Sequence, residues 1–194
     1  MAPREVVRVV GRSGAGKSTL LRALARLTPL RAGELRLDGV AAREIPAPRW
    51  RRRVAYLAQS PPSLPGSVWQ NLEAAFGCQL ARARREQLDR DVARAQAAEL
   101  LLDLDALGER EAARLSGGEL SRLSLLRALL IKPDVLLADE PSAALDAESA
   151  AALATRLSRY VDDGGALVLV AHDGARWAAL APREVTLEEQ QGSR

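Results

Sequence analysis

A glycine-rich turn near the start of the chain constrains the fold more than any other feature. The apolar run Glu5–Val10 predicts a buried strand, and the amphipathic segment Lys17–Leu27 predicts a helix. Between them stand Gly11, Gly14 and Gly16. Glycines let successive backbone N–H groups converge on one concavity, and a helix N-terminus adds its unpaired N–H groups and dipole. The stretch therefore predicts an anion-binding site between a strand and a helix.

The spacing of this turn indicates that the anion is a triphosphate. Residues 11–18 fit G-x-x-x-x-G-K-[ST], the P-loop pattern, in which Lys17 reaches the β- and γ-phosphates and the Ser18 hydroxyl coordinates Mg²⁺. The alternative is an accidental glycine-rich turn, but the strand before it and the helix after it supply the context that the pattern requires. We expect ATP to be held by Gly11, Ser13, Gly14, Ala15, Gly16, Lys17, Ser18 and Thr19.

Two carboxylates follow a second predicted strand. The continuous apolar run Val135–Ala138 is typical of a parallel strand covered on both faces, and Asp139 and Glu140 come directly after it. A P-loop enzyme needs a carboxylate at the end of a neighbouring strand to direct Mg²⁺. We therefore expect Asp139 to hold Mg²⁺ through water and Glu140 to accept a proton from attacking water. Without the P-loop, such a pair would more often be a solvated strand end.

A second helix start carries small residues suited to an anion. Leu115–Glu119, with sequence LSGGE, opens the predicted helix Ser116–Ile131. One chain has little use for two phosphate sites so far apart in sequence. Two chains packed head-to-tail do, because the LSGGE stretch of each would cover the nucleotide held by the other's P-loop. The alternative is a helix N-cap, since Ser before Gly-Gly-Glu caps well, and both interpretations can hold at once.

Strand–helix alternation at both ends of the chain predicts an α/β fold. Helical periodicity over Val68–Leu107 predicts an inserted helical region. The Asp38-Gly39 pair after the alternating stretch Glu34–Leu37 predicts a hairpin, and Ile45–Pro48 is broken by prolines. The remaining predicted elements are strands over Val54–Leu57 and Ala166–Ala171 and a helix over Ala147–Tyr160.

Composition excludes several classes of protein. The net charge of +3, from 28 basic and 25 acidic residues, is too small to indicate nucleic-acid binding. The single Cys78 cannot form an internal disulfide and favours a reducing compartment, and one histidine cannot build a histidine metal cluster. No stretch approaches the ~18 apolar residues of a membrane span, and the first residues lack the apolar core of a signal peptide.

Taken together, the motifs resemble those of the nucleotide-binding subunit of ABC transporters, in family order and over nearly the whole chain. The P-loop is the family's Walker A motif, and Gln59, after a strand, matches the Q-loop. Leu115–Glu119 resembles the signature LSGGQ, with Glu in the last place, and Asp139-Glu140 resembles Walker B. Ser142–Asp146 resembles the D-loop, and His172, after the last predicted strand, matches the switch histidine.

The resemblance implies a P-loop NTPase fold with a RecA-like core over residues 1–66 and 120–194 and a helical subdomain over residues 67–119, in one domain. It also implies that Gln59 senses Mg²⁺ and the attacking water, and that His172 contacts the γ-phosphate and holds Glu140 in place. The expected catalytic residues are Glu140, His172 and Gln59, and the expected metal site is Ser18, Gln59 and Asp139.

The remaining implied roles cross a homodimer interface. Ser116 and Gly118 would contact the γ-phosphate held by the opposite subunit, with Gly117 and Glu119 beside them, and Asp146 would bridge the two sites. The cofactors are then ATP and Mg²⁺. The partner is an integral membrane permease, which places the chain in the cytoplasm, peripheral on the inner face of the cell membrane.

The class of ABC protein follows from what the sequence lacks. It has no long heptad run before the signature, no second cassette and no cysteine-rich zinc module, which disfavours chromosome-organising, translation-type and excision-repair proteins. Ala58–Leu72 resembles exporter-type cassettes, particularly separate-subunit ATPases of iron or metal efflux. A short permease helix would dock in a groove near Gln59 and Ser67–Leu72, where Trp69 is either a contact or a core residue.

The start of the chain departs from the family pattern. Only ten residues precede Gly11 and none is aromatic, whereas family members usually carry two further antiparallel strands and an aromatic residue that stacks on adenine. We favour a truncated gene start over a naturally shortened cassette, and expect the antiparallel β part to be reduced, with an exposed edge at Glu34–Leu37. The rival functions are a weakly active regulatory module and a non-transport ATPase that acts on nucleic acid.

Overall fold

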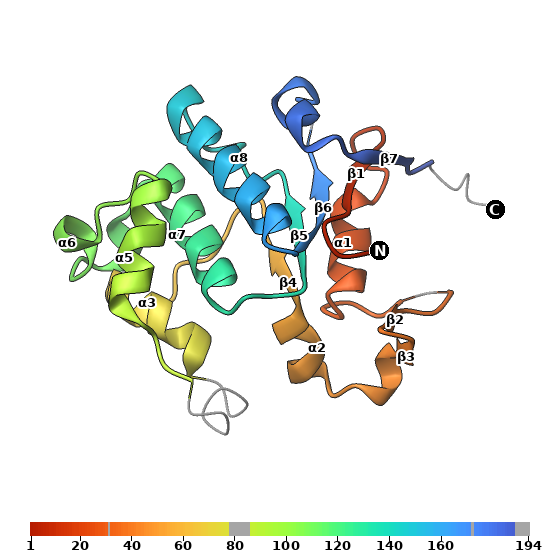
Figure 1. The fold of residues 1–194 in the computed structure, drawn as a ribbon, viewed down its shortest axis with the longest axis horizontal. Helices are drawn as coiled ribbons and strands as arrows, with labels where there is room; N and C mark the ends of the chain where they lie inside the picture. The colour runs from red at the N-terminus through yellow and green to blue at the C-terminus, as the bar shows by residue number, and fades with distance from the viewer. Residues whose placement is uncertain (31, 78–85, 172, 189–194) are drawn as a thin grey trace.

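A five-stranded parallel sheet forms the centre of the molecule in this computed structural model, which describes residues 1–30, 32–77, 86–171 and 173–188 (Figure 1). Its strands are β1 (Val6–Val10), β4 (Val54–Leu57), β5 (Val135–Asp139), β6 (Ala166–Val170) and β7 (Arg183–Thr186). They lie in the order β4-β5-β6-β1-β7, and every neighbouring pair is parallel. The α/β fold expected from the sequence is confirmed.

Each face of the sheet packs against its own apolar core, because successive side chains of a strand point to opposite faces. Leu136 and Leu167 are fully buried in one core, which contains the residues of α7 and α8. Leu137 and Val168 are buried in the other core, with Leu21 of α1. All five residues of β6 are buried, which is why the strand is a continuous apolar run.

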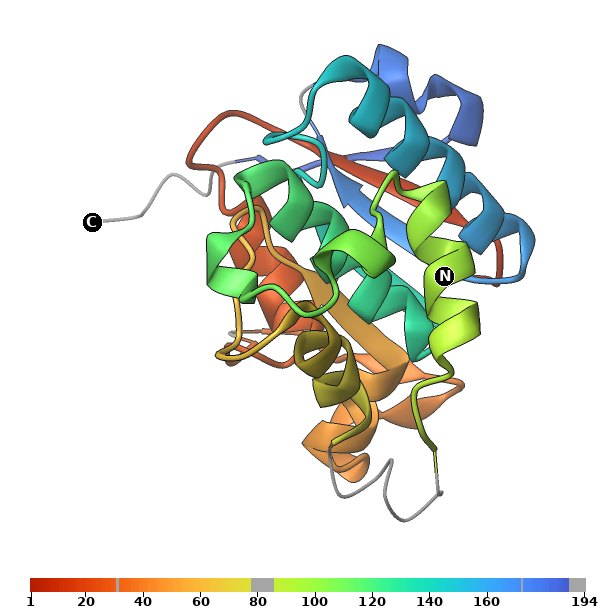
Figure 2. The same cartoon turned by 90° about the vertical axis from the view of Figure 1, so that its left-hand side faces the viewer.

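Helices therefore cover both faces, with α1 on one side and α7 and α8 on the other (Figure 1). Figure 2 looks onto the α7 and α8 side, where the shorter helices α3, α5 and α6 lie. The α-helices are α1 (Lys17–Leu24), α2 (Ala47–Arg53), α3 (Val68–Glu73), α5 (Arg90–Glu99), α6 (Leu104–Leu107), α7 (Gly117–Leu130) and α8 (Ala147–Asp162). The 3₁₀ turns are η1 (Ala42–Glu44), η2 (Ala74–Phe76), η3 (Ala112–Arg114) and η4 (Ala175–Leu180).

The two-residue strands β2 (Arg36–Leu37) and β3 (Val40–Ala41) form a separate antiparallel hairpin. Its turn residues Asp38 and Gly39 have φ of 51° and 79°, as a type I′ turn requires. This is the hairpin that the Asp-Gly pair predicts. Within the described ranges, β2 pairs with β3 alone, in agreement with the expected exposed edge.

Trp69 of α3 is a core residue, which decides between the two interpretations left open by the sequence. Its side chain is 4% exposed, and the guanidinium groups of Arg90 and Arg94 lie 4.6 and 5.3 Å from its ring centroid. Such cation–π contacts are stabilising where the ring is desolvated. Trp69 shares one apolar core with the sheet, so a subdomain boundary at residues 66–67 and 119–120 stays a prediction.

Three elements differ from the sequence expectations. Helix α2 begins at Ala47, where prolines suggested a break, because Pro48 stands in the first turn and needs no N–H partner there. Helix α1 ends at Leu24 rather than Leu27, since Arg26 takes φ of 55°. Strand β7 carries no apolar run and was not predicted. In the described part of the chain, no helix combines the length and apolarity needed to cross a bilayer.

We expect Gly165→Ala to destabilise the fold by about 1–3 kcal/mol. A Cβ at Gly165 would overlap three carbons of the Tyr160 ring. Hydrogen bonding holds that ring in place, because its hydroxyl lies 3.1 and 3.3 Å from the backbone oxygens of Pro133 and Ala166, which share its one proton. Urea unfolding measures the loss. The control is Gly77→Ala, whose Cβ would meet nothing closer than 3.5 Å, and equal stability of the two variants would contradict the packing described.

Candidate functional site

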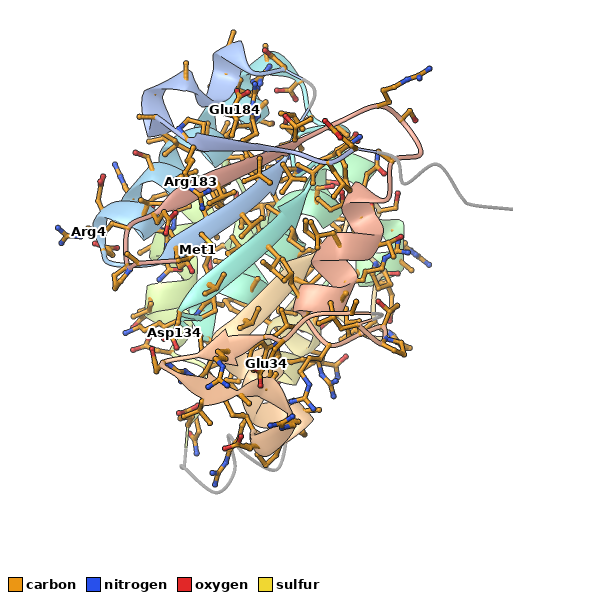
Figure 3. The ribbon with its side chains drawn as sticks, turned by 90° about the vertical axis from the view of Figure 1, so that its right-hand side faces the viewer. Met1, Arg4, Glu34, Asp134, Arg183 and Glu184 are labelled. Carbon is orange, nitrogen blue, oxygen red and sulfur yellow. The ribbon has the colours of Figure 1, made fainter. Side chains whose placement is uncertain are left out.

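Most of the residues singled out by the sequence meet at the carboxyl ends of the parallel strands. Gly11 follows β1, Gln59 follows β4, and Asp139 and Glu140 stand at the end of β5. Figure 3 labels Met1 and Asp134, which lie at the amino ends of β1 and β5, at the opposite edge of the sheet. Ligands of open α/β sheets bind at the carboxyl ends of the strands. The site of this chain therefore lies where the fold class places ligands.

The glycine-rich turn presents unpaired backbone N–H groups. Gly14 and Gly16 have φ of 84° and 89°, a conformation that side chains disfavour, and a Cβ on Gly11 would lie 2.7 Å from the Leu187 backbone oxygen. Helix α1 begins after Gly16 without a side-chain cap. By contrast, five other α-helices are capped, by Ser67, Asp89, Asp103, Ser116 and Asp146. The first N–H groups of α1 are thus left for an anion.

Lys17 lies over the turn to which it belongs. Its ammonium donates to the backbone oxygens of Gly11 and Arg12, each at 2.9 Å. These two bonds hold the cation beside the concavity of N–H groups. Ser18 and Thr19 follow in the first turn of α1, with Thr19 exposed. The positive end of the helix and the lysine charge together favour a multiply charged anion.

Asp139 is buried and only half satisfied. Its side chain is 2% exposed, its Oδ2 accepts a hydrogen bond from the Tyr56 hydroxyl at 3.0 Å, and its Oδ1 has no hydrogen-bond partner. A buried carboxylate oxygen without a partner is costly unless a cation or donor satisfies it. Together with the Ser18 hydroxyl and the Gln59 amide, the donors are the hard oxygens that Mg²⁺ prefers, so the residues present fit the ion.

Gln59 and Glu140 contact each other across strands β4 and β5. The Gln59 amide Nε2 donates to Glu140 Oε2 at 2.9 Å. Glu140 adopts φ of 47°, and its backbone N–H donates to the Val170 oxygen at 2.9 Å. A left-handed backbone at a non-glycine residue costs energy and persists where the surrounding structure holds it, often at functional sites.

The LSGGE stretch lies on the other face of the sheet. Ser116 is the N-cap of α7 in a capping box: its Oγ accepts from the Glu119 N–H at 3.2 Å, and its own N–H donates to Glu119 Oε2 at 2.7 Å. This bond to the Ser116 N–H lowers the pKa of Glu119 below its usual value. Because α7 and α1 cover opposite faces, one chain does not bring this helix start beside its own P-loop.

The D-loop lies against the signature stretch within the chain. A Cβ on Gly118 would stand 3.3 Å from the Ala144 oxygen and 3.4 Å from the Leu145 side chain. Asp146 is the N-cap of α8, accepting from the Ser149 N–H at 2.7 Å, and this bond lowers the pKa of Asp146. The structure thus places the expected residues in two groups. The P-loop, Gln59, Asp139 and Glu140 lie at the carboxyl ends of the strands, whereas Leu115–Glu119 and Asp146 lie on the α7 and α8 side of the sheet. His172 lies outside the described residues.

Tyr56 and Arg22 are the polar residues that the sequence analysis missed. Tyr56 on β4 donates to Asp139, and the Arg22 Nε of α1 donates to the Tyr56 hydroxyl at 3.4 Å. Burial raises the pKa of Tyr56, so the hydroxyl keeps its proton at neutral pH. Only the register of the sheet brings them together: Tyr56 pairs with Leu137 on the neighbouring parallel strand, two positions before Asp139.

Comparison with known proteins shows the family of the chain. The profile of the ABC transporter family matches residues 1–143, and the chain belongs to this family. Among its relatives, the Fe(3+) ions import ATP-binding protein of Streptomyces coelicolor is 39% identical over 193 residues, which are 97% of this chain and 53% of that protein. An aliphatic sulfonates import ATP-binding protein of Xanthomonas axonopodis is 36% identical over 197 residues, 100% of this chain and 74% of that protein.

Solved structures share the fold. The ATP-binding cassette MJ0796, a dimer in a post-hydrolysis state bound to ADP and Pi, superposes with a TM-score of 0.80 at 25% identity, over 99% of this chain and 84% of that chain. A bacterial Atm1-family ABC exporter with ATP bound also gives 0.80, at 23% identity, over 96% of this chain and 32% of that chain. The P-loop NTPase fold of the ABC type is therefore confirmed. The chain spans about half the length of several of the relatives it matches.

We expect the capping box to make stability depend on pH. The pKa of Glu119 is lowered in the folded protein, so its stabilisation is fully present above about pH 4.5, the usual value, and is lost as the pH falls through the lowered pKa. Glu119→Gln keeps a capping side chain but not the charge. In urea unfolding, wild type should be more stable than this variant at pH 7, and the difference in stability should shrink as the pH falls below about 4.5.

The exposed Glu109, mutated to Gln, is the control and should show no such convergence. A difference between wild type and Glu119→Gln that stays constant from pH 7 to pH 3 would contradict the charged cap.

Proposed function

We propose that this chain is the ATP-binding subunit of an ABC transporter and hydrolyses ATP to drive transport through a separate membrane permease. One observation carries the proposal: a single sheet edge combines the uncapped N–H groups of α1, the Lys17 ammonium, the half-satisfied Asp139 and the Gln59–Glu140 pair. Family membership and the ADP- and Pi-bound neighbour support it.

The triphosphate would lie on the N–H groups of the turn, the residues from Gly11 to Thr19 named above. Its phosphates would replace the Gly11 and Arg12 oxygens as partners of Lys17. Mg²⁺ would be held by Ser18, Gln59 and Asp139, and when bound it supplies charge neutralisation for the phosphates. For hydrolysis, Glu140 would accept the proton of the attacking water, while Gln59 holds the Glu140 carboxylate in position.

A second copy of the chain would complete the site. Because α7 and α1 cover opposite faces, the signature of one subunit serves the P-loop of another in a head-to-tail homodimer. Ser116, Gly117, Gly118 and Glu119 would then cover the partner's γ-phosphate, and Asp146 would bridge the two sites. His172 would contact the γ-phosphate within its own subunit. The dimeric cassettes among the structural neighbours are consistent with this arrangement.

The permease would dock in an apolar groove of about 500 Å³ between α2, β4, the loop after Gln59 and α7. This groove begins beside Gln59, at Ala58, but is not lined by Ser67–Leu72, where the sequence placed part of the docking site. Pro61, Pro62 and Leu64 form one wall, and Asn71 holds it by accepting from the Leu64 N–H at 2.9 Å. Trp69 contributes nothing to this surface, being buried elsewhere. A short permease helix seated here would place the chain in the cytoplasm, peripheral on the inner face of the membrane.

The proposal extends to ATP-driven transport and not to a cargo. The sequence stretch Ala58–Leu72 favours export, of iron or another metal, whereas several relatives are named as import proteins for iron, spermidine, sulfonates or glycine betaine. These names support neither export nor one substrate. The rival functions stay distinct: hydrolysis stimulated by DNA or RNA would favour the nucleic-acid ATPase, and nucleotide binding without hydrolysis would favour the regulatory module.

We expect Glu140→Gln to bind ATP, to lose at least about 100-fold in hydrolysis and to accumulate a nucleotide-bound dimer. The amide preserves the shape of the side chain but cannot accept the proton. Phosphate release and gel filtration with Mg-ATP measure the two effects. Glu109→Gln, an exposed change in the same residue type, should behave as wild type. Hydrolysis by Glu140→Gln at the wild-type rate would remove Glu140 from this role.

A further inference from the structure

A chain of three side chains leads from α1 to the carboxylate at the end of β5. The Arg22 Nε–H donates to the Tyr56 hydroxyl oxygen at 3.4 Å, and Tyr56 donates to Asp139 Oδ2 at 3.0 Å. A phenol has one proton. Because its oxygen already accepts from Arg22, that proton is directed to Asp139, and the direction of both bonds is fixed.

The register of the sheet explains why these residues meet. Tyr56 pairs with Leu137 on the neighbouring parallel strand, and Leu137 is buried in the α1-side core. Tyr56 packs against the same core. Asp139 follows Leu137 by two positions and so points to the same face of β5. Arg22 reaches this face from α1, five residues after Lys17. The hydroxyl therefore lies between the P-loop helix and the end of β5.

The bond to Tyr56 distinguishes the two oxygens of Asp139. Rotation of a carboxylate about its last torsion is broad, so without a partner neither oxygen has a fixed place. Here Oδ2 is held by Tyr56, whereas Oδ1 is buried without a partner. One oxygen is thus held by Tyr56, and the other has no partner within the protein.

We propose that Tyr56 is a positioning residue, whose hydroxyl orients Asp139 so that one carboxylate oxygen is reserved for the Mg²⁺ of the nucleotide complex. This inference rests on the proposed function. Partners that orient a ligand in this way commonly change metal affinity about 10- to 100-fold when removed. The competing interpretation is that Tyr56 only satisfies a buried carboxylate and contributes to stability.

The test is Tyr56→Phe, which removes the hydroxyl and leaves the ring. Binding of a fluorescent ATP analogue is measured as Mg²⁺ is titrated, and again with EDTA. We expect the Mg²⁺ concentration at half-saturation to rise about tenfold, with affinity in EDTA unchanged. Arg22→Gln keeps the Tyr56 hydroxyl but removes the Arg22 donor that directs the hydroxyl proton to Asp139. It should also raise the Mg²⁺ concentration at half-saturation, by a smaller factor.

The chain offers a matched control in its only other tyrosine. Tyr160→Phe removes a buried hydroxyl that bonds to backbone oxygens near the amino ends of β5 and β6. It should lower stability and leave the Mg²⁺ titration unchanged. The proposal is overturned if Tyr56→Phe titrates as wild type, or if Tyr160→Phe shifts equally. If the wild-type protein binds no nucleotide, both the proposed function and this inference are wrong. If the wild type binds nucleotide in a Mg²⁺-dependent way and Tyr56→Phe has the same half-saturating Mg²⁺ concentration, only this inference is wrong.

Discussion

The uncapped start of α1 is the feature on which the rest of the structure depends. A helix leaves its first N–H groups without intrahelical partners, and five other helices of this chain satisfy them with Ser or Asp side chains. At α1 the glycine turn takes that place. The unsatisfied donors, the helix dipole and Lys17 combine into a site that needs an anion to complete it.

The order of the strands places the other residues of the candidate site beside this anion site. Strand β1 lies inside the sheet, beside β6 and then β5. The carboxyl ends of these three parallel strands therefore lie next to one another, at the same edge of the sheet. Asp139 is buried there with one oxygen held by Tyr56 and one without a partner. The same parallel arrangement puts α1 and α7 on opposite faces, which separates the P-loop from the signature in each chain. This separation is the structural basis of the head-to-tail dimer that we propose.

Sequence patterns predicted what local chemistry determines. The glycine turn, the buried strands β5 and β6, the Asp-Gly hairpin and the Ser116 cap each depend on a few neighbouring residues, and each lies where expected. Patterns failed where tertiary contacts decide. Strand β7 has little apolar signal and exists through pairing with β1. Trp69 is covered by arginines of α5, and Tyr56 reaches Asp139 only when β4 pairs with β5.

The proposal that two copies share a nucleotide site is tested most directly by disulfide trapping between copies. In a Cys78→Ser, Glu140→Gln background, one copy carries Ser13→Cys in the exposed turn and the other Gly117→Cys, where a Cβ would meet no atom closer than 3.9 Å. The account predicts crosslinked dimers of the two variants in the presence of Mg-ATP and few without it. Absence of the crosslink with Mg-ATP, or formation of a disulfide within a single chain that carries both cysteines, would contradict it.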